Sequence, residues 1–469
     1  MRSGNDGQSK PPFNKILDDL ARRQLMHDFQ FGNAGKRYEA RKNIGAGAFG
    51  IVCEAVDITT GDSVAIKKIG HASATPTLAR RTLREIRVLR YIRHENIVQL
   101  RDIFRIPGSL GINVYMVMDL MEGSLHHVIH GCEDYLEYDL VVFFLYQLLR
   151  GLKYLHAAGI AHRDLKPSNL LVNRDCHLRI ADFGMAKLAL PERTDNLEEH
   201  CFYMTQHVAT LPYRAPELLF VLPEHSTAVD MWAVGCILAE MLLRRELFPG
   251  RTVSSQIGIL VTQLGTPSRT MLDQILCEKT KRYIENLGHC SGCQWTDIVP
   301  FEPSESRSEP CPEAIDLISN LMKMEAKDRF DVLEAIYHPF LKQFHSTRIT
   351  EGACPFKVKM DMNDVEQLSN DELVEAVIND IRSAADDDYR FSTTGPLKSV
   401  LLSDRKSVKN DPGYNVQSSL HSESVSSHTS TTSQTSATST STSGNAASFS
   451  LIPEIQEIPE DSNTQITAL

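Results

Sequence analysis

The stretch from residue 160 to residue 217 constrains the fold of this chain more than any other, because three short motifs occur in it in one order. His-Arg-Asp stands at 162–164 with an asparagine at 169, Asp-Phe-Gly stands at 182–184, and Ala-Pro-Glu stands at 215–217. One such motif arises easily by chance, but three in order with further motifs upstream do not. We therefore interpret the stretch as one catalytic centre.

The residue types in these motifs suit the transfer of a phosphoryl group, which depends more on positioning and charge neutralisation than on covalent chemistry. Asp164 is suited to accept the proton of a substrate hydroxyl, and Lys166 to reach the transferred phosphate. Asn169 and Asp182 carry the oxygen atoms that Mg²⁺ prefers. The segment between them, residues 170–180, predicts two short strands around a turn. Such a hairpin brings the two metal ligands together.

A glycine-rich turn between two β-prone segments lies upstream of these motifs. Glycines at such a turn let backbone N–H groups approach phosphates. The pattern alone also fits a dinucleotide-binding fold, but there the turn leads into a helix. Here it leads into a predicted strand, then a hairpin at 59–62 and a strand that contains Lys67. The residues of the turn are Ile44, Gly45, Ala46, Gly47, Ala48, Phe49, Gly50, Ile51 and Val52.

Glycine turn, hairpin, lysine strand and the three downstream motifs follow one another as in the protein kinases, which the chain resembles. The resemblance implies an α+β, two-lobed protein kinase fold, with a small β-rich N-lobe and a large helical C-lobe. It implies a serine/threonine kinase that uses ATP and Mg²⁺, with Asp164 as the base and Lys166 stabilising the transferred charge. Lys67 then holds the α- and β-phosphates. Glu85, on a basic helix predicted over 77–93, is its partner rather than a solvated surface acid.

The same resemblance assigns the remaining walls of the nucleotide site. Met118 is expected at the back of the adenine pocket, where it also packs in the core, and Asp119 to Met121 are expected to form the hinge. Ser124 stands where the family has an aspartate that touches the ribose, and a hydroxyl hydrogen-bonds there more weakly. Ala65 and Leu171 complete the set of nucleotide-binding residues that the resemblance implies.

Residues 38 to about 385 are similar to the mitogen-activated protein kinases throughout, and most similar to the large extracellular-signal-regulated kinase subclass. The similarity is carried by segments such as LFPG at 247–250, QLGTPS at 263–268 and HPFL at 338–341. It implies a kinase of intracellular signal transduction, in the cytoplasm, the nucleus or both. The implied partners are protein substrates with Ser/Thr-Pro sites and an upstream activating kinase.

These patterns divide the chain into four predicted parts. They are an N-terminal extension over 1–37 with a short helix over about 16–26, a kinase domain over 38–345, a C-terminal extension over 346–385 that wraps back on the kinase, and a tail over 386–469. The kinase domain consists of an N-lobe over 38–118 and a C-lobe over 119–345, with a family insert over about 252–310. The tail is rich in Ser and Thr and holds too little apolar surface to offset its ordering entropy, so we expect it to be disordered.

Two acidic residues of the helical lobe are expected to be structural. Asp230 lies within an apolar run, where a charge is costly unless it is hydrogen-bonded. We expect Asp230 to brace the backbone near His162, and Glu217 to pair with Arg329.

The activation lip departs from the family pattern, which is Thr-x-Tyr with both hydroxyls phosphorylated. Here residues 205–207 read Thr-Gln-His, and Leu211 replaces an arginine that helps to bind the phosphotyrosine. The cradle for a phosphothreonine is retained in Arg84, Arg163 and Lys187. A phosphate at Thr205 brings about −1.5 to −2 charge and can order the lip against these cations. Our hypothesis is activation through Thr205 alone.

Substrate selection and docking carry further departures. Pro212 replaces a family tryptophan beside the substrate pocket, but Leu-Pro at this place resembles the cyclin-dependent kinases, which also prefer proline after the target residue. We therefore keep the Ser/Thr-Pro preference. The family's acidic docking cluster is depleted to one acid and one base over residues 345–351. Basic docking peptides are expected to bind poorly, which leaves the docking partners open.

Charge and hydropathy argue against several other classes of protein. The net charge is −11 and no basic stripe is apparent, so nucleic-acid binding is not expected. The longest apolar run, residues 140–149, is too short to span a bilayer, and the N-terminus shows no apolar signal-peptide core, so no membrane association is expected. The ten cysteines show no disulfide framework, which suits a reducing compartment.

A non-catalytic scaffold with the kinase fold, signalling through binding, is the alternative function. Pseudokinases usually lose the counterpart of Lys67, Asp164 or Asp182, and all three are present here. An active kinase is therefore the preferred hypothesis.

Overall fold

The computed structural model describes residues 23–47, 50–131, 136–188, 208–223, 225–299, 312–345, 365 and 367–391. Ala48 and Phe49 of the glycine turn and Thr205 of the lip lie outside these residues, as do the tail beyond Phe391 and much of the predicted C-terminal extension. No helix in the described ranges is long and apolar enough to cross a bilayer.

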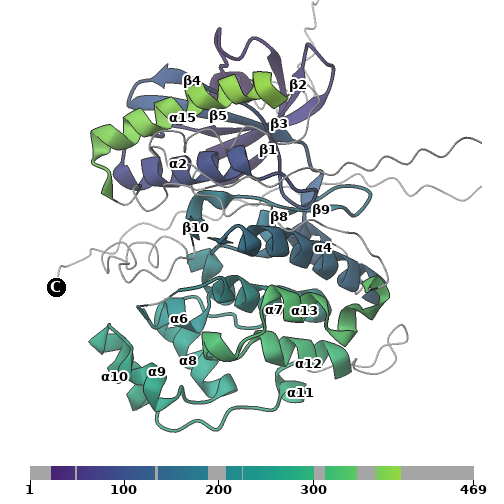
Figure 1. The fold of residues 1–469 in the computed structure, drawn as a ribbon, viewed down its shortest axis with the longest axis vertical. Helices are drawn as coiled ribbons and strands as arrows, with labels where there is room; N and C mark the ends of the chain where they lie inside the picture. The colour runs from purple at the N-terminus through teal and green to yellow at the C-terminus, as the bar shows by residue number, and fades with distance from the viewer. Residues whose placement is uncertain are drawn as a thin grey trace, which may run out of the picture. The chain divides into compact units, whose positions relative to one another are not determined.

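Five antiparallel strands of the N-terminal part form one sheet in the order β1-β2-β3-β5-β4 (Figure 1). The strands are β1 (Tyr38–Gly47), β2 (Gly50–Asp57), β3 (Ser63–Ile69), β4 (Leu100–Gly108) and β5 (Gly111–Asp119). The register places Val52 opposite Lys67 and Ala65 opposite Met118. Directly opposed residues share a face, as do residues two apart in a strand. These four side chains therefore line one face of the sheet.

The opposite face of the sheet is covered by the segment that precedes β1. Residues 23–28 are helical, and the part of the predicted 16–26 helix before residue 23 lies outside the described residues. Leu25, Phe29 and Phe31 are buried in one cluster with sheet residues. The Phe31 ring meets those of Tyr115 and Phe104 edge-on, with ring centroids 5.7 and 6.0 Å apart. Part of the predicted N-terminal extension therefore packs on this face of the sheet and belongs to its hydrophobic core.

Helix α2 (Pro76–Tyr91) lies on the sheet, and helix α15 (Asn370–Phe391) lies alongside it (Figure 1). Leu373, Val377 and Ile381 recur every four residues on α15 and are buried, as expected of one apolar helix face. Asp380 of α15 also accepts hydrogen bonds from Arg87 Nε at 2.8 Å and Arg90 Nη1 at 3.0 Å. The helix continues to Phe391, past residue 385 where we placed the end of the extension.

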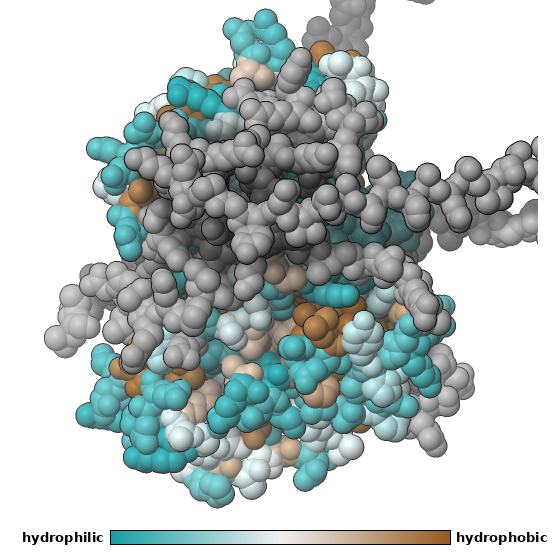
Figure 2. Space-filling model, viewed as in Figure 1, coloured by the Kyte–Doolittle hydropathy of each residue, from teal (hydrophilic) through white to brown (hydrophobic). Residues whose placement is uncertain are grey.

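The remaining elements form a mostly helical part, whose surface in the view of Figure 2 is mainly hydrophilic where it is described. Its first half contains β6 (Gly123–Ser124), α3 (Leu125–His130), α4 (Tyr138–Ala157), β7 (Ile160–Ala161), η1 (Pro167–Asn169), β8 (Leu170–Val172), β9 (Leu178–Ile180), η2 (Phe183–Met185), β10 (Lys187–Leu188) and η3 (Val208–Tyr213). Its second half contains α6 (Pro216–Leu219), α7 (Ala228–Leu243), α8 (Val253–Leu264), α9 (Arg269–Asp273), α10 (Glu278–Asn286), α11 (Trp295–Ile298), α12 (Pro312–Leu321), η4 (Ala326–Asp328), α13 (Val332–Ile336) and η5 (Pro339–Phe344).

Helix α7 forms the centre of this helical part, because nearly all of its side chains are buried. At its edge, Arg329 donates to both carboxylate oxygens of Glu217, at 2.8 and 3.0 Å, which confirms the pair expected from the sequence. Both side chains of the pair are buried. A paired, hydrogen-bonded geometry of this kind offsets the desolvation that burial of two charges entails.

We expect Phe31→Ala to lower the free energy of unfolding by about 3 kcal/mol, because it leaves a cavity among the aromatic rings. Met26→Ala is the matched control, since Met26 belongs to the same segment and is 60% exposed. Urea unfolding of the full-length protein, followed by circular dichroism, measures both changes. Equal stability of the two variants would contradict the packing role of Phe31.

Candidate active site

The catalytic loop after β7 is fixed by a buried carboxylate of α7. Asp230 accepts hydrogen bonds from the backbone N–H groups of His162 and Arg163, both at 2.8 Å, and lies 3.0 Å from His156 Nε2. The brace expected from the sequence is thereby confirmed. Arg163 has a φ of 67°, a left-handed conformation that is strained for a residue with a side chain. The contacts of Asp230 hold the loop in this strained form.

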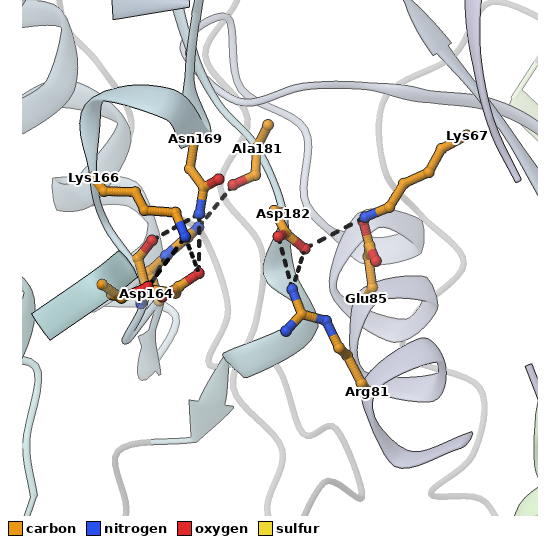
Figure 3. Close-up of polar contacts among 10 residues, drawn as sticks. Lys67, Arg81, Glu85, Asp164, Lys166, Asn169, Ala181 and Asp182 are labelled. Atoms are coloured by element: carbon orange, nitrogen blue, oxygen red, sulfur yellow. Dashed lines mark hydrogen bonds and ion pairs between the residues drawn. The ribbon is translucent and has the colours of Figure 1, made fainter. Parts of the chain in front are cut away.

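Asp164 lies at the centre of the loop with its neighbours arranged around one oxygen (Figure 3). Asn169 Nδ2 donates to Asp164 Oδ2 at 3.1 Å and to its carbonyl oxygen at 2.8 Å, and Lys166 Nζ lies 3.4 Å from Oδ2. The other oxygen, Oδ1, is buried and has no hydrogen-bond partner within the described residues. A buried acceptor of this kind calls for a partner from outside. A substrate hydroxyl that donates to Oδ1 fits this requirement.

Thr210 of η3 is a site residue that the sequence analysis missed. Lys166 Nζ donates to Thr210 Oγ1 at 3.1 Å, so the lysine is held between this hydroxyl and Asp164. Thr210 is buried, with 2% of its surface exposed. Its position a few residues before Ala-Pro-Glu is the only signal in the sequence, and many threonines near a motif would match it.

Asn169 and Asp182 are brought together by the predicted hairpin, which the structure forms as β8 and β9. The N–H of Ala181 donates to the carbonyl oxygen of Asn169 at 2.9 Å, which ties the two ends of the hairpin. Asp182 adopts φ 63° and ψ 74°, and the ring of the following Phe183 packs edge-on to His162 with centroids 4.9 Å apart. The amide oxygen and the carboxylate are a hard donor set that fits Mg²⁺.

No cluster of three or more His, Cys, Asp or Glu that could hold a metal occurs in the described part of the chain. This finding is compatible with Mg²⁺, which typically takes one or two protein oxygens and completes its octahedron with water and substrate phosphates. Asn169 and Asp182 would therefore complete a Mg²⁺ site only when a nucleotide is also bound.

Lys67 of β3 joins the sheet to α2 and to the Asp-Phe-Gly motif (Figure 3). Its Nζ lies 2.6 Å from Glu85 Oε1 and 3.4 Å from Asp182 Oδ1. Burial lowers the pKa of Lys67, but the charges of Asp182 and Glu85 outweigh that effect and raise it above its ordinary value. The lysine therefore remains a cation in the site. Burial likewise raises the pKa of Asp182, but Lys67 and Arg81 together hold it below its usual range.

Arg81 of α2 is the second contact that the sequence analysis did not find. Its Nη2 donates to both oxygens of Asp182, at 2.9 Å to Oδ1 and 2.7 Å to Oδ2 (Figure 3). In the sequence, Arg81 is only one of several basic residues of the helix predicted over 77–93. Arg81 precedes Glu85 by one helical turn, so both side chains lie on the same face of α2.

The predicted nucleotide-binding residues that the structure describes come from the five-stranded sheet and from the smaller sheet of β6, β8 and β9, and Ile51 packs against the aromatic cluster on the opposite face of the larger sheet. The register of β1 against β2 pairs Gly45 with Val52, Ala46 with Ile51 and Gly47 with Gly50, and Ile44 lies in β1 just before these pairs. Ala65 lies opposite Met118 in the sheet, and Leu171 of β8 lies opposite Ser124 of β6. The carbonyl oxygen of Lys68 would be only 2.5 Å from a Cβ atom at Gly50, so this position requires glycine.

The hinge residues have side-chain partners that the sequence did not indicate. Asp119 bonds to Arg101 Nε at 2.6 Å and to Arg179 Nη1, so its carboxylate is engaged and its backbone is the part left for adenine. Ser124 Oγ lies 2.9 Å from His127 Nδ1. The hydroxyl expected at the ribose therefore already has a protein partner. Met121 is half-buried between these residues in the chain.

The residues of the predicted phosphate cradle come from separate elements. Lys187 of β10 pairs with Ala161 of β7, which places it beside the strand that leads to Arg163. Arg84 is buried on α2, with 6% of its surface exposed. Thr205, their expected ligand once phosphorylated, lies outside the described residues.

The fold and this site define a protein kinase, and the family model of the protein kinase domain matches residues 38–341. The chain is 54% identical over 384 residues to the mitogen-activated protein kinase sma-5 of Caenorhabditis elegans, which covers 81% of this chain and 75% of that protein. It is 40% identical over 331 residues to the mitogen-activated protein kinase HOG1 of Candida albicans, covering 70% of this chain and 82% of that one. The chain belongs to the mitogen-activated protein kinase family.

Membership of this family confirms several predictions made from the sequence. The two-lobed protein kinase fold and the activity of a serine/threonine protein kinase are both borne out. Kinases of this family generally use ATP and Mg²⁺, and they bind protein substrates and upstream kinases. The alternative of a non-catalytic scaffold is not favoured.

We expect Thr210→Val to lower kcat/KM for a peptide substrate about tenfold, the effect of losing one hydrogen bond to a charged group. The volume of the side chain is nearly unchanged, so the loss reports the hydroxyl that positions Lys166. Thr210→Ser keeps that hydroxyl and is expected to retain most of the activity. Steady-state kinetics of the three proteins make the test. Full activity of Thr210→Val would show that the hydroxyl does not position Lys166.

Proposed function

We propose that this kinase transfers the γ-phosphoryl group of ATP to serine or threonine residues that precede proline in protein substrates, and that it is switched on through Thr205. The observation that carries the proposal is the convergence of Asp164, Lys166 and Asn169 from the catalytic loop with Asp182 and its partner Lys67. Three separate elements supply these side chains, and each has the chemistry that phosphoryl transfer requires.

Asp164 acts as the base. Its unpartnered oxygen Oδ1 accepts the proton of the substrate hydroxyl, while Asn169 holds the other oxygen in place. Lys166, held by Thr210, neutralises charge on the phosphoryl group as it passes to the substrate. Because these partners are fixed in advance, little reorganisation is needed when the substrate arrives.

Lys67 and Glu85 orient the nucleotide, and Asn169 and Asp182 are the residues that would hold Mg²⁺. When bound, MgATP supplies the phosphoryl group and neutralises charge on its phosphates. The glycine turn between β1 and β2 provides backbone N–H groups toward the phosphates, and the hinge after Asp119 provides backbone groups toward adenine.

Activation through Thr205 is supported by three cations that the family resemblance assigns to a phosphothreonine and that come from separate elements. Arg84, Arg163 and Lys187 come from α2, the catalytic loop and β10. A phosphate there would bind all three elements together, which would link the lip to the catalytic loop and to the helix that carries Glu85. The absence of the family's lip tyrosine leaves Thr205 as the single hydroxyl of the Thr-Gln-His sequence.

The finer assignments rest on the sequence. We propose that the kinase is nearest the large extracellular-signal-regulated subclass and that it works in the cytoplasm, the nucleus or both. The depleted acidic cluster after residue 345 indicates that docking partners differ from the basic peptides bound by other family members. The Leu-Pro sequence at 211–212 supports a proline preference in the substrate.

We expect protein phosphorylated at Thr205 to transfer phosphate to a Ser-Pro peptide at least about tenfold faster than Thr205→Ala, because charge-assisted hydrogen bonds order the lip. Radiolabelled ATP measures the transfer, with the phosphorylated state verified by mass spectrometry. Asp164→Asn is the control for a contaminating kinase. Equal rates of the phosphorylated protein and Thr205→Ala would remove Thr205 as the switch.

The proline preference is tested with a pair of peptides that differ only at the position after the target serine. We expect the peptide with proline to have a kcat/KM at least about tenfold above that of the peptide with alanine, the ratio that about 1.4 kcal/mol of selectivity produces. A ratio near one would show that Leu211 and Pro212 do not maintain the preference.

A further inference from the structure

Arg81 hydrogen-bonds to the carboxylate of Asp182, which the proposed function assigns as a ligand of Mg²⁺. One nitrogen of its guanidinium, Nη2, donates to both oxygens of Asp182, at 2.9 and 2.7 Å. The only other cation that contacts this carboxylate in the described part of the chain is Lys67, at the longer distance of 3.4 Å. Arg81 is therefore the dominant partner of Asp182 in this structure (Figure 3).

The path of the Arg81 side chain depends on Gly184 of the Asp-Phe-Gly motif. A Cβ atom at Gly184 would lie 2.4 Å from Arg81 Nε, 2.5 Å from Cγ and 3.0 Å from Cδ. A residue with a side chain would therefore displace the arginine. The arginine is also 4% exposed, so it is packed into this place rather than lying on the surface. The contact with Asp182 is thus built into the fold.

A divalent cation and Arg81 make opposing demands on Asp182. Mg²⁺ requires a carboxylate oxygen at close range, and it is repelled by a guanidinium on the same carboxylate. Binding the metal at Asp182 must therefore either displace a hydrogen bond from Arg81 or place two cations on one carboxylate. In both cases the arginine opposes the metal.

We propose that Arg81 competes with Mg²⁺ for Asp182 and so sets the concentration of Mg²⁺ at which the kinase takes up its nucleotide. This inference rests on the metal role proposed above for Asp182. It makes Arg81 a positioning residue that acts through Asp182 and contacts no substrate. A purely structural role would have the opposite sign, since loss of a residue that only orients Asp182 would weaken the metal site.

The test measures binding of ADP to the full-length, unphosphorylated protein as Mg²⁺ is titrated, followed by isothermal calorimetry. Arg81→Gln is expected to lower the Mg²⁺ concentration for half-maximal enhancement of ADP binding about tenfold, as expected for loss of a charged hydrogen-bonding partner. Arg81→Lys retains the charge without the planar fork and should fall between Arg81→Gln and the unchanged protein.

Arg80→Gln is the matched control, because Arg80 is the preceding residue of the same helix and bonds instead to the carbonyl oxygens of Val365 and Leu368. It removes the same charge from a neighbouring, half-buried position and should leave the Mg²⁺ dependence unchanged. Circular dichroism verifies that each variant is folded. The calorimetric readout requires no phosphotransfer.

Asp182→Asn separates failure of this inference from failure of the proposed function. It should abolish the enhancement of ADP binding by Mg²⁺. If it does not, the metal role of Asp182 is wrong. If it does, while Arg81→Gln and Arg81→Lys both leave the Mg²⁺ dependence unchanged or shift it to higher concentration, the metal role stands and the competition is overturned.

Discussion

The contact of Lys67 with two carboxylates is the interaction on which the arrangement of this molecule depends. Glu85 belongs to α2, Asp182 follows β9, and Lys67 belongs to the sheet, so one ammonium group joins three elements that are far apart in the sequence. The side chain of Lys67 is mostly buried, with 13% of its surface exposed, and a charge at such a place would be strongly unfavourable without a partner. The positions of the sheet, α2 and the segment after β9 therefore depend on one another.

Helix α2 is held from two sides by contacts within the described part of the chain. Toward the site it carries Glu85 and Arg81, which contact Lys67 and Asp182. On another side it carries Arg87 and Arg90, which contact Asp380 of α15. The basic residues of this helix, which are evident in the sequence, therefore make two kinds of contact. Arg81 contacts Asp182, whereas Arg87 and Arg90 bind α15.

The sequence predicted those parts of the fold and site whose signals are local. The strands on either side of the glycine turn, the strand with Lys67 and the hairpin between Asn169 and Asp182 each follow from short patterns, and the structure forms these strands and this hairpin. The partners of Glu217 and Asp230 were also predictable, because a buried charge demands a counterpart and few candidates were available.

The sequence did not predict contacts that depend on side-chain paths between distant elements. Arg81 was one of several arginines on a helix, and only the position of that helix relative to Asp182 distinguishes it from Arg80. Thr210 gave no signal beyond being a threonine near a motif. The packing of Phe31 was missed for a related reason, since a segment rich in glycine and polar residues does not show from its pattern that its aromatic residues have a sheet to cover.

Leu25, Phe29 and Phe31 form a layer over the sheet, so the folded domain includes residues that precede the start of the family match. The family pattern starts at Tyr38, but the apolar face of β2, β3 and β5 is closed by residues that come before it. A protein truncated at Tyr38 would leave Tyr115 and Phe104 without their cover and present water with a contiguous apolar surface, which favours self-association. The folding unit therefore extends before the start of the family match, and a shortened form of this kinase should retain the segment that contains Leu25, Phe29 and Phe31.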